Sequence, residues 1–270
     1  MDGEALDVTR IPEEAPTGQN FFSKPQGITI DETKDLIFVS NVGSNKVTVI
    51  DGKTQKPIAN VSVNTSPQTI VFNTLTNKLY SLSPVDNTVA IVDVYKKDYP
   101  VKTINVGKQP RGTSINKKTN RIYISNAGDS SISIIDGAKE EVIKTVILPN
   151  RSFPLVISVN EEKNKVYVVL YGSNAIQVID GETGEAEQQI VVGQNPIWVR
   201  YIPELNRIFV TVEGEKKIVI INPENNQILQ NIQISGIPYR IFFNKATNGV
   251  YINRRNSNLV TVISSENEAL

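Results

Sequence analysis

The sequence predicts an all-β fold, namely a single six-bladed β-propeller of four-stranded antiparallel blades. A proline recurs along most of the chain at positions Pro25, Pro67, Pro110, Pro154, Pro196 and Pro238. Subtracting successive positions gives spacings of 42, 43, 44, 42 and 42 residues. Each interval contains short segments rich in β-branched and aromatic residues, separated by turn residues. Repeats of this length built from short strands are typical of propeller blades.

The third copy shows the expected order of elements within one blade. Four strands are predicted at residues 111–115, 121–125, 131–135 and 142–147. The second has a high density of β-branched and aromatic residues, and the third alternates polar and apolar side chains. Between the third and fourth strands, Asp136-Gly137 predicts a tight hairpin, because both residue types tolerate a positive φ.

The other copies repeat this order. Their second strands are expected at residues 37–41, 79–83, 166–169, 208–211 and 250–253. The turn before each second strand carries Asn or Asp, at Asp35, Asn77, Asn120, Asn164, Asn206 and Asn248. These residue types suit the left-handed backbone conformation that such turns often need.

The segment from the second to the third strand of each copy, such as Ile122 to Gly137, resembles the YVTN-type (YncE-like) β-propeller repeat. The resemblance recurs six times, covers roughly residues 25–263, and is specific for fold but not for activity. It implies a surface, periplasmic or secreted protein, so an extracellular or cell-surface location is favoured. Such relatives often have seven blades, which makes a seven-bladed propeller the alternative.

One domain is expected over residues 1–270, with blades at about 25–66, 67–109, 110–153, 154–195, 196–237 and 238–265. The last copy supplies strands at 239–244, 250–254 and 259–264, and a fourth strand is missing. The segment Ala5–Ile11 alternates in the manner of the other fourth strands. We therefore hypothesise that it completes the last blade and closes the ring, with the rest of residues 1–24 forming a surface loop.

Composition excludes several classes of function. The chain has 28 Lys and Arg residues and 28 Asp and Glu residues, so zero net charge gives no support for nucleic acid as a partner. No run of 18 apolar residues is present, so no membrane insertion is expected, and the first residues do not resemble a signal peptide. With neither Cys nor His, disulfides, Cys/His zinc sites and Ser-His-Asp triads are excluded. We expect no cofactor, no metal site and no catalytic residues.

The loops before the first strand and after the second strand of each blade gather at one end of a propeller channel. Arg and aromatic residues are concentrated in these loops, with Arg200 one step further along a first strand: Arg111, Arg151, Phe153, Tyr171, Trp198, Arg200, Tyr239, Arg240, Arg254 and Arg255. Arg recognises carboxylate or phosphate through paired hydrogen bonds, and both residue types are enriched in interface hot spots. These residues therefore predict a face that binds a protein or a small anionic ligand.

Structural roles are the competing interpretation of the same residues. Trp198 is also suited to packing between blades, and Arg200 to an ion pair with Glu204 or Glu213. A recurring aspartate at Asp51, Asp93, Asp136 and Asp180 is explained by turn chemistry. The residue after the proline has five identities in the six copies, and we expect this variable position to determine specificity: Gln26, Gln68, Arg111, Leu155, Ile197 and Tyr239.

The sequence thus favours a non-catalytic binding or scaffold propeller. A propeller enzyme of the lactonase or lyase type is one alternative, and a subunit of a surface assembly is another. The first strands carry Thr29, Val71, Ser114, Ser158, Arg200 and Phe242 at one repeated position, without a carboxylate, which disfavours a hydrolase that uses a divalent metal. Oligomeric state is left open.

Overall fold

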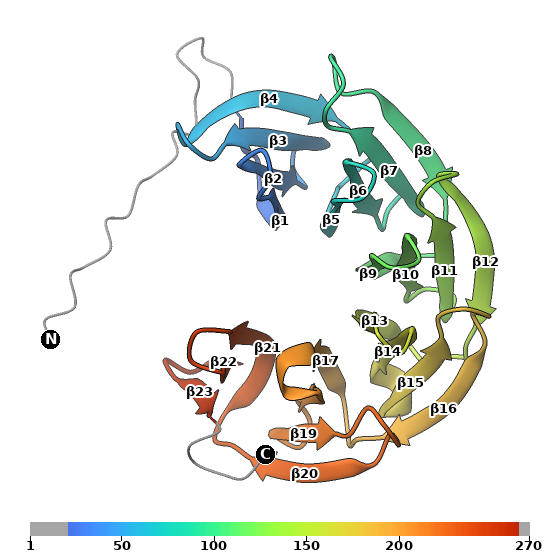
Figure 1. The fold of residues 1–270 in the computed structure, drawn as a ribbon, viewed down its shortest axis with the longest axis vertical. Coiled ribbons are helices and arrows are strands. Elements are labelled where there is room, and N and C mark those ends of the chain that lie inside the picture. Colours follow the sequence, from blue (N-terminus) through green and yellow to red (C-terminus); the bar gives the residue numbers. More distant parts are fainter. Residues whose placement is uncertain (1–20, 265–270) are drawn as a thin grey trace, which may run out of the picture. The chain divides into compact units, whose positions relative to one another are not determined.

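A computed structural model describes residues 21–264, which form 23 strands, two short 3-10 helices and connecting turns (Figure 1). Consecutive strands are neighbours in six separate sheets, five with four strands and one with three, and the pairing is antiparallel. The chain divides into two compact units, 1–103 and 104–270. No helix among the described residues is long and apolar enough to cross a membrane.

The first unit contains two sheets. The first sheet consists of β1 (Pro25–Asp31), β2 (Leu36–Asn41), β3 (Lys46–Asp51) and β4 (Lys56–Ser62). The second consists of β5 (Ile70–Asn73), β6 (Lys78–Ser83), β7 (Thr88–Asp93) and β8 (Val101–Asn105), whose last two residues belong to the second unit.

The second unit contains the other four sheets. The first two of them consist of β9 (Pro110–Asn116), β10 (Arg121–Asn126), β11 (Ser131–Asp136) and β12 (Glu141–Ile147), and of β13 (Pro154–Asn160), β14 (Lys165–Leu170), β15 (Ala175–Asp180) and β16 (Ala186–Val191). The third consists of β17 (Pro196–Ile202), β18 (Arg207–Val212), β19 (Lys217–Ile221) and β20 (Ile228–Gln233). The last has three strands, β21 (Ile237–Asn244), β22 (Gly249–Arg255) and β23 (Val260–Ile263). The 3-10 helices are η1 (Tyr171–Ser173) and η2 (Pro203–Leu205).

The predicted strand order is confirmed, including the three strands of the last copy. The Asn or Asp of every turn before a second strand is left-handed, with φ between 46° and 56° at Asp35, Asn77, Asn120, Asn164, Asn206 and Asn248. The predicted closing strand, Ala5–Ile11, lies outside the described residues.

The predicted Asp136-Gly137 hairpin is wrong in its details. The positive φ falls on Glu140 (56°), not on Asp136 or Gly137. The Asp136 side chain instead accepts hydrogen bonds from the backbone N–H groups of Ala138 (2.9 Å) and Lys139 (3.0 Å). A longer turn therefore replaces the two-residue one, because the aspartate stabilises the turn through its side chain. This contact also explains the aspartate that recurs at this position.

The hydrophobic core lies between neighbouring sheets within each unit. One cluster joins β14 and β15 to β17 and β18, and includes Tyr167, Val178, Val199 and Tyr201. A second joins β10 and β11 to β13 and β14, and a third joins β17 to β19 with the sheet β21–β23. In the first unit, the stacked rings of Phe38 and Phe72, 5.6 Å apart, belong to the cluster between its two sheets. Burial of apolar surface between sheets thus holds each unit together.

Candidate functional site

A small hollow of about 190 Å³ lies where the first strands of the four sheets in the second unit meet. In this unit β9 contacts β13, β13 contacts β17, and β17 contacts β21, as can be followed in Figure 1. We call this site the arginine hollow. It is lined by Arg111, Gly112, Leu155, Val156, Ile197, Trp198, Tyr239 and Arg255.

In the second unit, a local irregularity in strand pairing adjoins the residues that follow the prolines and line this hollow. The register between first and second strands shifts just after the opening proline in β1, β9, β13, β17 and β21. Such an irregularity can redirect a side chain that regular pairing would constrain. Within the second unit, the residues that follow the prolines all line the hollow: Arg111, Leu155, Ile197 and Tyr239.

Polar side chains of the second strands hold these segments in place. The Ser125 hydroxyl accepts a hydrogen bond from Gly112 N–H (2.8 Å) and donates one to the Leu155 carbonyl. The Thr211 hydroxyl donates to the Tyr239 carbonyl (2.8 Å). In the last sheet, the Asn253 side chain of β22 accepts a hydrogen bond from the backbone N–H of Arg240 in β21 (2.8 Å). The first strands β9, β13 and β21 are therefore fixed by a second strand of their own sheet or of the preceding one.

Gly112 permits the close approach of β9 to β13. A Cβ at this position would lie 2.1 Å from the Leu155 carbonyl oxygen and 2.9 Å from the Ser125 hydroxyl. No other residue fits without moving backbone, so this glycine is needed for space and not for a positive φ.

One side of the hollow is formed by interleaved aromatic rings and guanidinium groups. The rings of Trp198 and Tyr239 meet edge to face, with centroids 6.0 Å apart and an interplanar angle of 66°. The guanidinium carbon of Arg240 lies 5.4 Å from the Trp198 ring centroid and 5.5 Å from that of Tyr239. That of Arg255 lies 3.8 Å from the Tyr239 ring centroid. These cation–π contacts restrain both guanidinium groups beside the hollow.

Positive charge predominates around the hollow. Arg111, Arg240 and Arg255 contribute three cationic groups, and Glu213 contributes one carboxylate, 3.8 Å from the Arg255 guanidinium. Burial raises the pKa of Tyr239, but the Arg255 hydrogen bond and the charges of Arg255 and Arg240 outweigh it, so this pKa is held below its usual value. The surroundings therefore favour a negative charge.

The structure brings together Arg111, Trp198, Tyr239, Arg240 and Arg255 of the ten residues that the sequence singled out. Arg200 is directed elsewhere, since its guanidinium donates to the Ile241 carbonyl (3.0 Å). Burial lowers the pKa of Arg200. The expected Arg200 ion pairs are absent from the described residues, where Glu204 pairs with Lys245 (2.7 Å) and Glu213 with Arg255.

Four further predicted residues lie away from the arginine hollow. Arg254 donates to Thr261 (2.8 Å) and to Ser235 (2.9 Å) at the side of β23. Arg151, Phe153 and Tyr171 lie together at the ends of β13 and β14, where the Tyr171 N–H donates to the Phe153 carbonyl (3.2 Å). Phe153 is 47% exposed.

The sequence prediction, which rested on Arg and aromatic residues, did not include the apolar residues of the hollow or Glu213. Leu155, Val156 and Ile197 are not residues that suggest a site by type, and Leu155 and Val156 also pack against the core. The divergence after each proline did point to Leu155 and Ile197. Trp198 lines the hollow and also packs against the cluster of β17–β23.

Replacing Thr211 by valine tests the support of Tyr239. The change keeps the shape and leaves the Tyr239 carbonyl without its donor, so we expect the free energy of unfolding to fall by about 1–2 kcal/mol. Thr113→Val is the matched control, because the Thr113 hydroxyl is buried without a hydrogen-bond partner among the described residues. Urea denaturation measures both. Equal stabilities of the two variants would contradict this role of Thr211.

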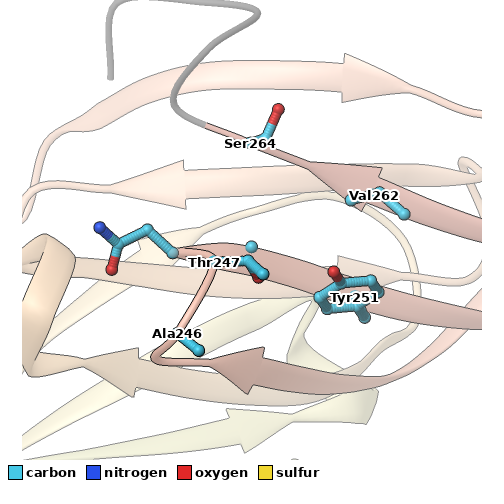
Figure 2. Close-up of a pocket in the computed structure, with 7 residues that line it drawn as sticks. Ala246, Thr247, Tyr251, Val262 and Ser264 are labelled. Atoms are coloured by element: carbon cyan, nitrogen blue, oxygen red, sulfur yellow. The ribbon is translucent and has the colours of Figure 1, made fainter.

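Two other hollows are lined almost entirely by uncharged residues. One of about 500 Å³ lies on the last sheet, where Tyr251 of β22 and Val262 of β23 flank the turn residues Ala246 and Thr247 (Figure 2). The other, of about 380 Å³, lies in the first unit between the segments 60–62 and 98–101. Among residues 21–264, no cluster of three or more carboxylate side chains is arranged to hold a metal ion.

Comparison with solved structures identifies the fold. Hydrazine synthase from Kuenenia stuttgartiensis superposes with a TM-score of 0.76 at 20% identity, covering 97% of this chain and 80% of that chain. Virginiamycin B lyase from Staphylococcus aureus gives 0.76 at 16% identity, covering 90% and 82%. Both are β-propeller proteins. The chain has a β-propeller fold.

At these identities the likeness to the two propellers concerns the fold alone. A second structure of the Staphylococcus aureus lyase, a catalytically inactive histidine-to-alanine variant with quinupristin, gives a TM-score of 0.75 at 16% identity and covers 90% of this chain and 82% of that chain. No family model matches the sequence. No curated protein matches it either.

Proposed function

We propose that this propeller is a binding protein that recognises an anionic group at the arginine hollow. The observation that carries the proposal is the set of three guanidinium groups, opposed by one carboxylate, around an aromatic pair. A guanidinium stacked on a ring keeps its N–H edge available for two parallel hydrogen bonds to a carboxylate or phosphate. Because the ring contacts already restrain Arg240 and Arg255, binding requires little further ordering of these two side chains.

A binding role is preferred to catalysis for a chemical reason. In the comparison above, virginiamycin B lyase with a histidine replaced by alanine is catalytically inactive. This chain contains no His, so it cannot supply the same group. The similarity to a lyase therefore does not carry that protein's chemistry over to this one.

An enzyme that removes a proton is the second candidate function, favoured by the lowered pKa of Tyr239. A phenolate beside two arginines can accept a proton from a carbon next to a bound carboxylate. A panel of carboxylates with a leaving group on the β carbon would reveal such an activity through the absorbance of the new C=C bond. Activity that is lost in Tyr239→Phe would support it, and no turnover with any member would count against it.

The binding proposal is testable through Trp198, because it is the one tryptophan of the chain and its ring lines the hollow. Acetate and phosphate, titrated at constant ionic strength, should change Trp198 fluorescence with saturation, whereas ethylammonium should not. Arg240→Gln should weaken the response. Lys245→Gln is the matched control, because Lys245 is exposed and pairs with Glu204 away from the hollow. If neither anion saturates the signal, the proposal is wrong.

We also propose that the six sheets are the six blades of one propeller, and that residues 5–11 supply the fourth strand of the last blade. The three-stranded sheet β21–β23 supports this proposal, because the other five sheets each have four strands. The side chains of Val260 and Val262 in β23 are 56% and 52% exposed, as expected if a further strand normally pairs with this edge of the sheet.

Deleting residues 1–12 should then lower the melting temperature sharply, since the last sheet loses both strand pairing and the cover of its edge. Circular dichroism on heating measures the change. The control replaces residues 1–12 with a Gly/Ser segment of equal length, which should melt at the same low temperature as the deletion. An unchanged melting temperature in the deletion would exclude the closing strand.

A further inference from the structure

The floor of the arginine hollow differs in chemistry from its rim. Leu155 and Val156 of β13 and Ile197 of β17 form an apolar surface below the charged groups. Ile197 is only 6% exposed, and the side chains of Leu155 and Val156 are half-buried against the core. A ligand that filled the hollow would therefore contact apolar side chains of β13 and β17 and guanidinium groups from the sheets on either side of them.

This division disfavours a small, fully charged anion. A phosphate or sulfate in contact with the floor would lose water from oxygens that Leu155, Val156 and Ile197 cannot hydrogen-bond. A monocarboxylate can place both of its oxygens toward Arg111, Arg240 or Arg255 and keep its apolar part against the floor.

The size of the hollow limits the apolar part. Its volume of about 190 Å³ lies below the roughly 300–1,000 Å³ of sites for drug-sized ligands. The space suits one ring or one branched side chain with its carboxylate. The rings of Trp198 and Tyr239, which line the hollow at 66° to one another, also offer apolar surface against which such a group can pack.

We infer that the arginine hollow selects a carboxylate attached to a single apolar group of about the size of a cyclohexyl ring. This inference rests on the proposed function and names its ligand class. Two sources offer this chemistry: a free cyclic or branched carboxylic acid, and the C-terminus of a peptide whose last residue is apolar.

The test measures Trp198 fluorescence with cyclohexanecarboxylate, which does not absorb in the range of tryptophan, against acetate, phosphate and neutral cyclohexanecarboxamide. Cyclohexanecarboxylate should bind at least about tenfold more tightly than acetate, because several methylene groups leave water. The carboxamide should bind at least about tenfold more weakly than cyclohexanecarboxylate, because it lacks the charge. The tripeptide Gly-Gly-Leu and its C-terminal amide form the second arm. Tighter binding of the peptide acid than of cyclohexanecarboxylate assigns the source to a chain terminus, and the reverse assigns it to a free acid.

Leu155→Asn tests the apolar floor of the hollow. Asparagine is close to leucine in size, and the backbone carbonyl at this position accepts a hydrogen bond from Ser125. The variant should lose the preference for cyclohexanecarboxylate over acetate. The inference is overturned if wild type binds acetate or phosphate as tightly as cyclohexanecarboxylate, a result that leaves anion recognition intact. Absence of any anion response would instead refute the proposed function. The wild-type ligand series decides the question even if Leu155→Asn does not fold.

Discussion

Replacing Arg255 by methionine is expected to weaken the binding of cyclohexanecarboxylate by roughly ten- to a hundredfold, the range for losing hydrogen bonds to a charged group. The methionine keeps much of the contact with the Tyr239 ring, so the change removes charge more than packing. It also leaves Glu213 without its cation, 3.8 Å away in the native protein, which adds repulsion against an anion. Fluorescence titration of Trp198 gives the affinity directly.

Arg254→Met is the matched control for this experiment. The two arginines are adjacent in sequence, but the Arg254 guanidinium donates to Thr261 and Ser235. Its loss should reduce stability modestly and leave the affinity within about twofold, because surface substitutions away from a site have small effects. Equal losses of affinity in the two variants would show that general positive charge, and not the hollow, attracts the anion.

Raising the pH is expected to weaken carboxylate binding by about tenfold for each unit by which the bound ligand raises the pKa of Tyr239. The pKa of Tyr239 lies below its usual value because the contributions of Arg255 and Arg240 outweigh burial. A phenolate formed as pH rises through this pKa places a negative charge beside the ligand. Affinity is therefore full while Tyr239 is protonated and falls as it ionises.

Tyr239→Phe separates this effect from other titrations, because it should bind with nearly constant affinity over the same alkaline range. The charged groups that face Tyr239 are Arg240 of its own strand, Arg255 of β22, Arg111 of β9 and, through Arg255, Glu213. Arginine stays protonated in proteins, and the chain has no His or Cys that would titrate near neutral pH. The same fall in affinity in both proteins would contradict the role of Tyr239.

Local rules explain why the strands were predictable. Strand order followed from alternation and turn residues, because the pairing of consecutive strands depends mainly on nearby sequence. The left-handed Asn120 and its counterparts were predictable for the same reason. At Asp136 the rule failed, since the aspartate can stabilise a longer turn as well as a short one, and sequence alone does not choose between them.

The site was predictable only in part because side-chain direction depends on contacts between sheets. Arg254 and Arg255 are neighbours of identical type, yet the side chain of only the second lines the hollow. Arg200 resembles a ligand-binding residue in sequence, but the Ile241 carbonyl of the next sheet engages it. The apolar floor of the hollow was not predictable for a different reason. Leucine and isoleucine are the ordinary residues of a β core, so their presence does not indicate a site.

The shift in strand register after the opening proline of β9, β13, β17 and β21 has a consequence for how this scaffold can diverge. Arg111, Leu155, Ile197 and Tyr239 occupy the same place in successive sheets, and a shift in pairing adjoins each of them. Substitution should therefore cost little stability at the exposed Arg111 and more at Ile197, which is buried. Each of the four sheets of the second unit contributes one such position to the hollow, so the ligand preference of this scaffold can change one residue at a time.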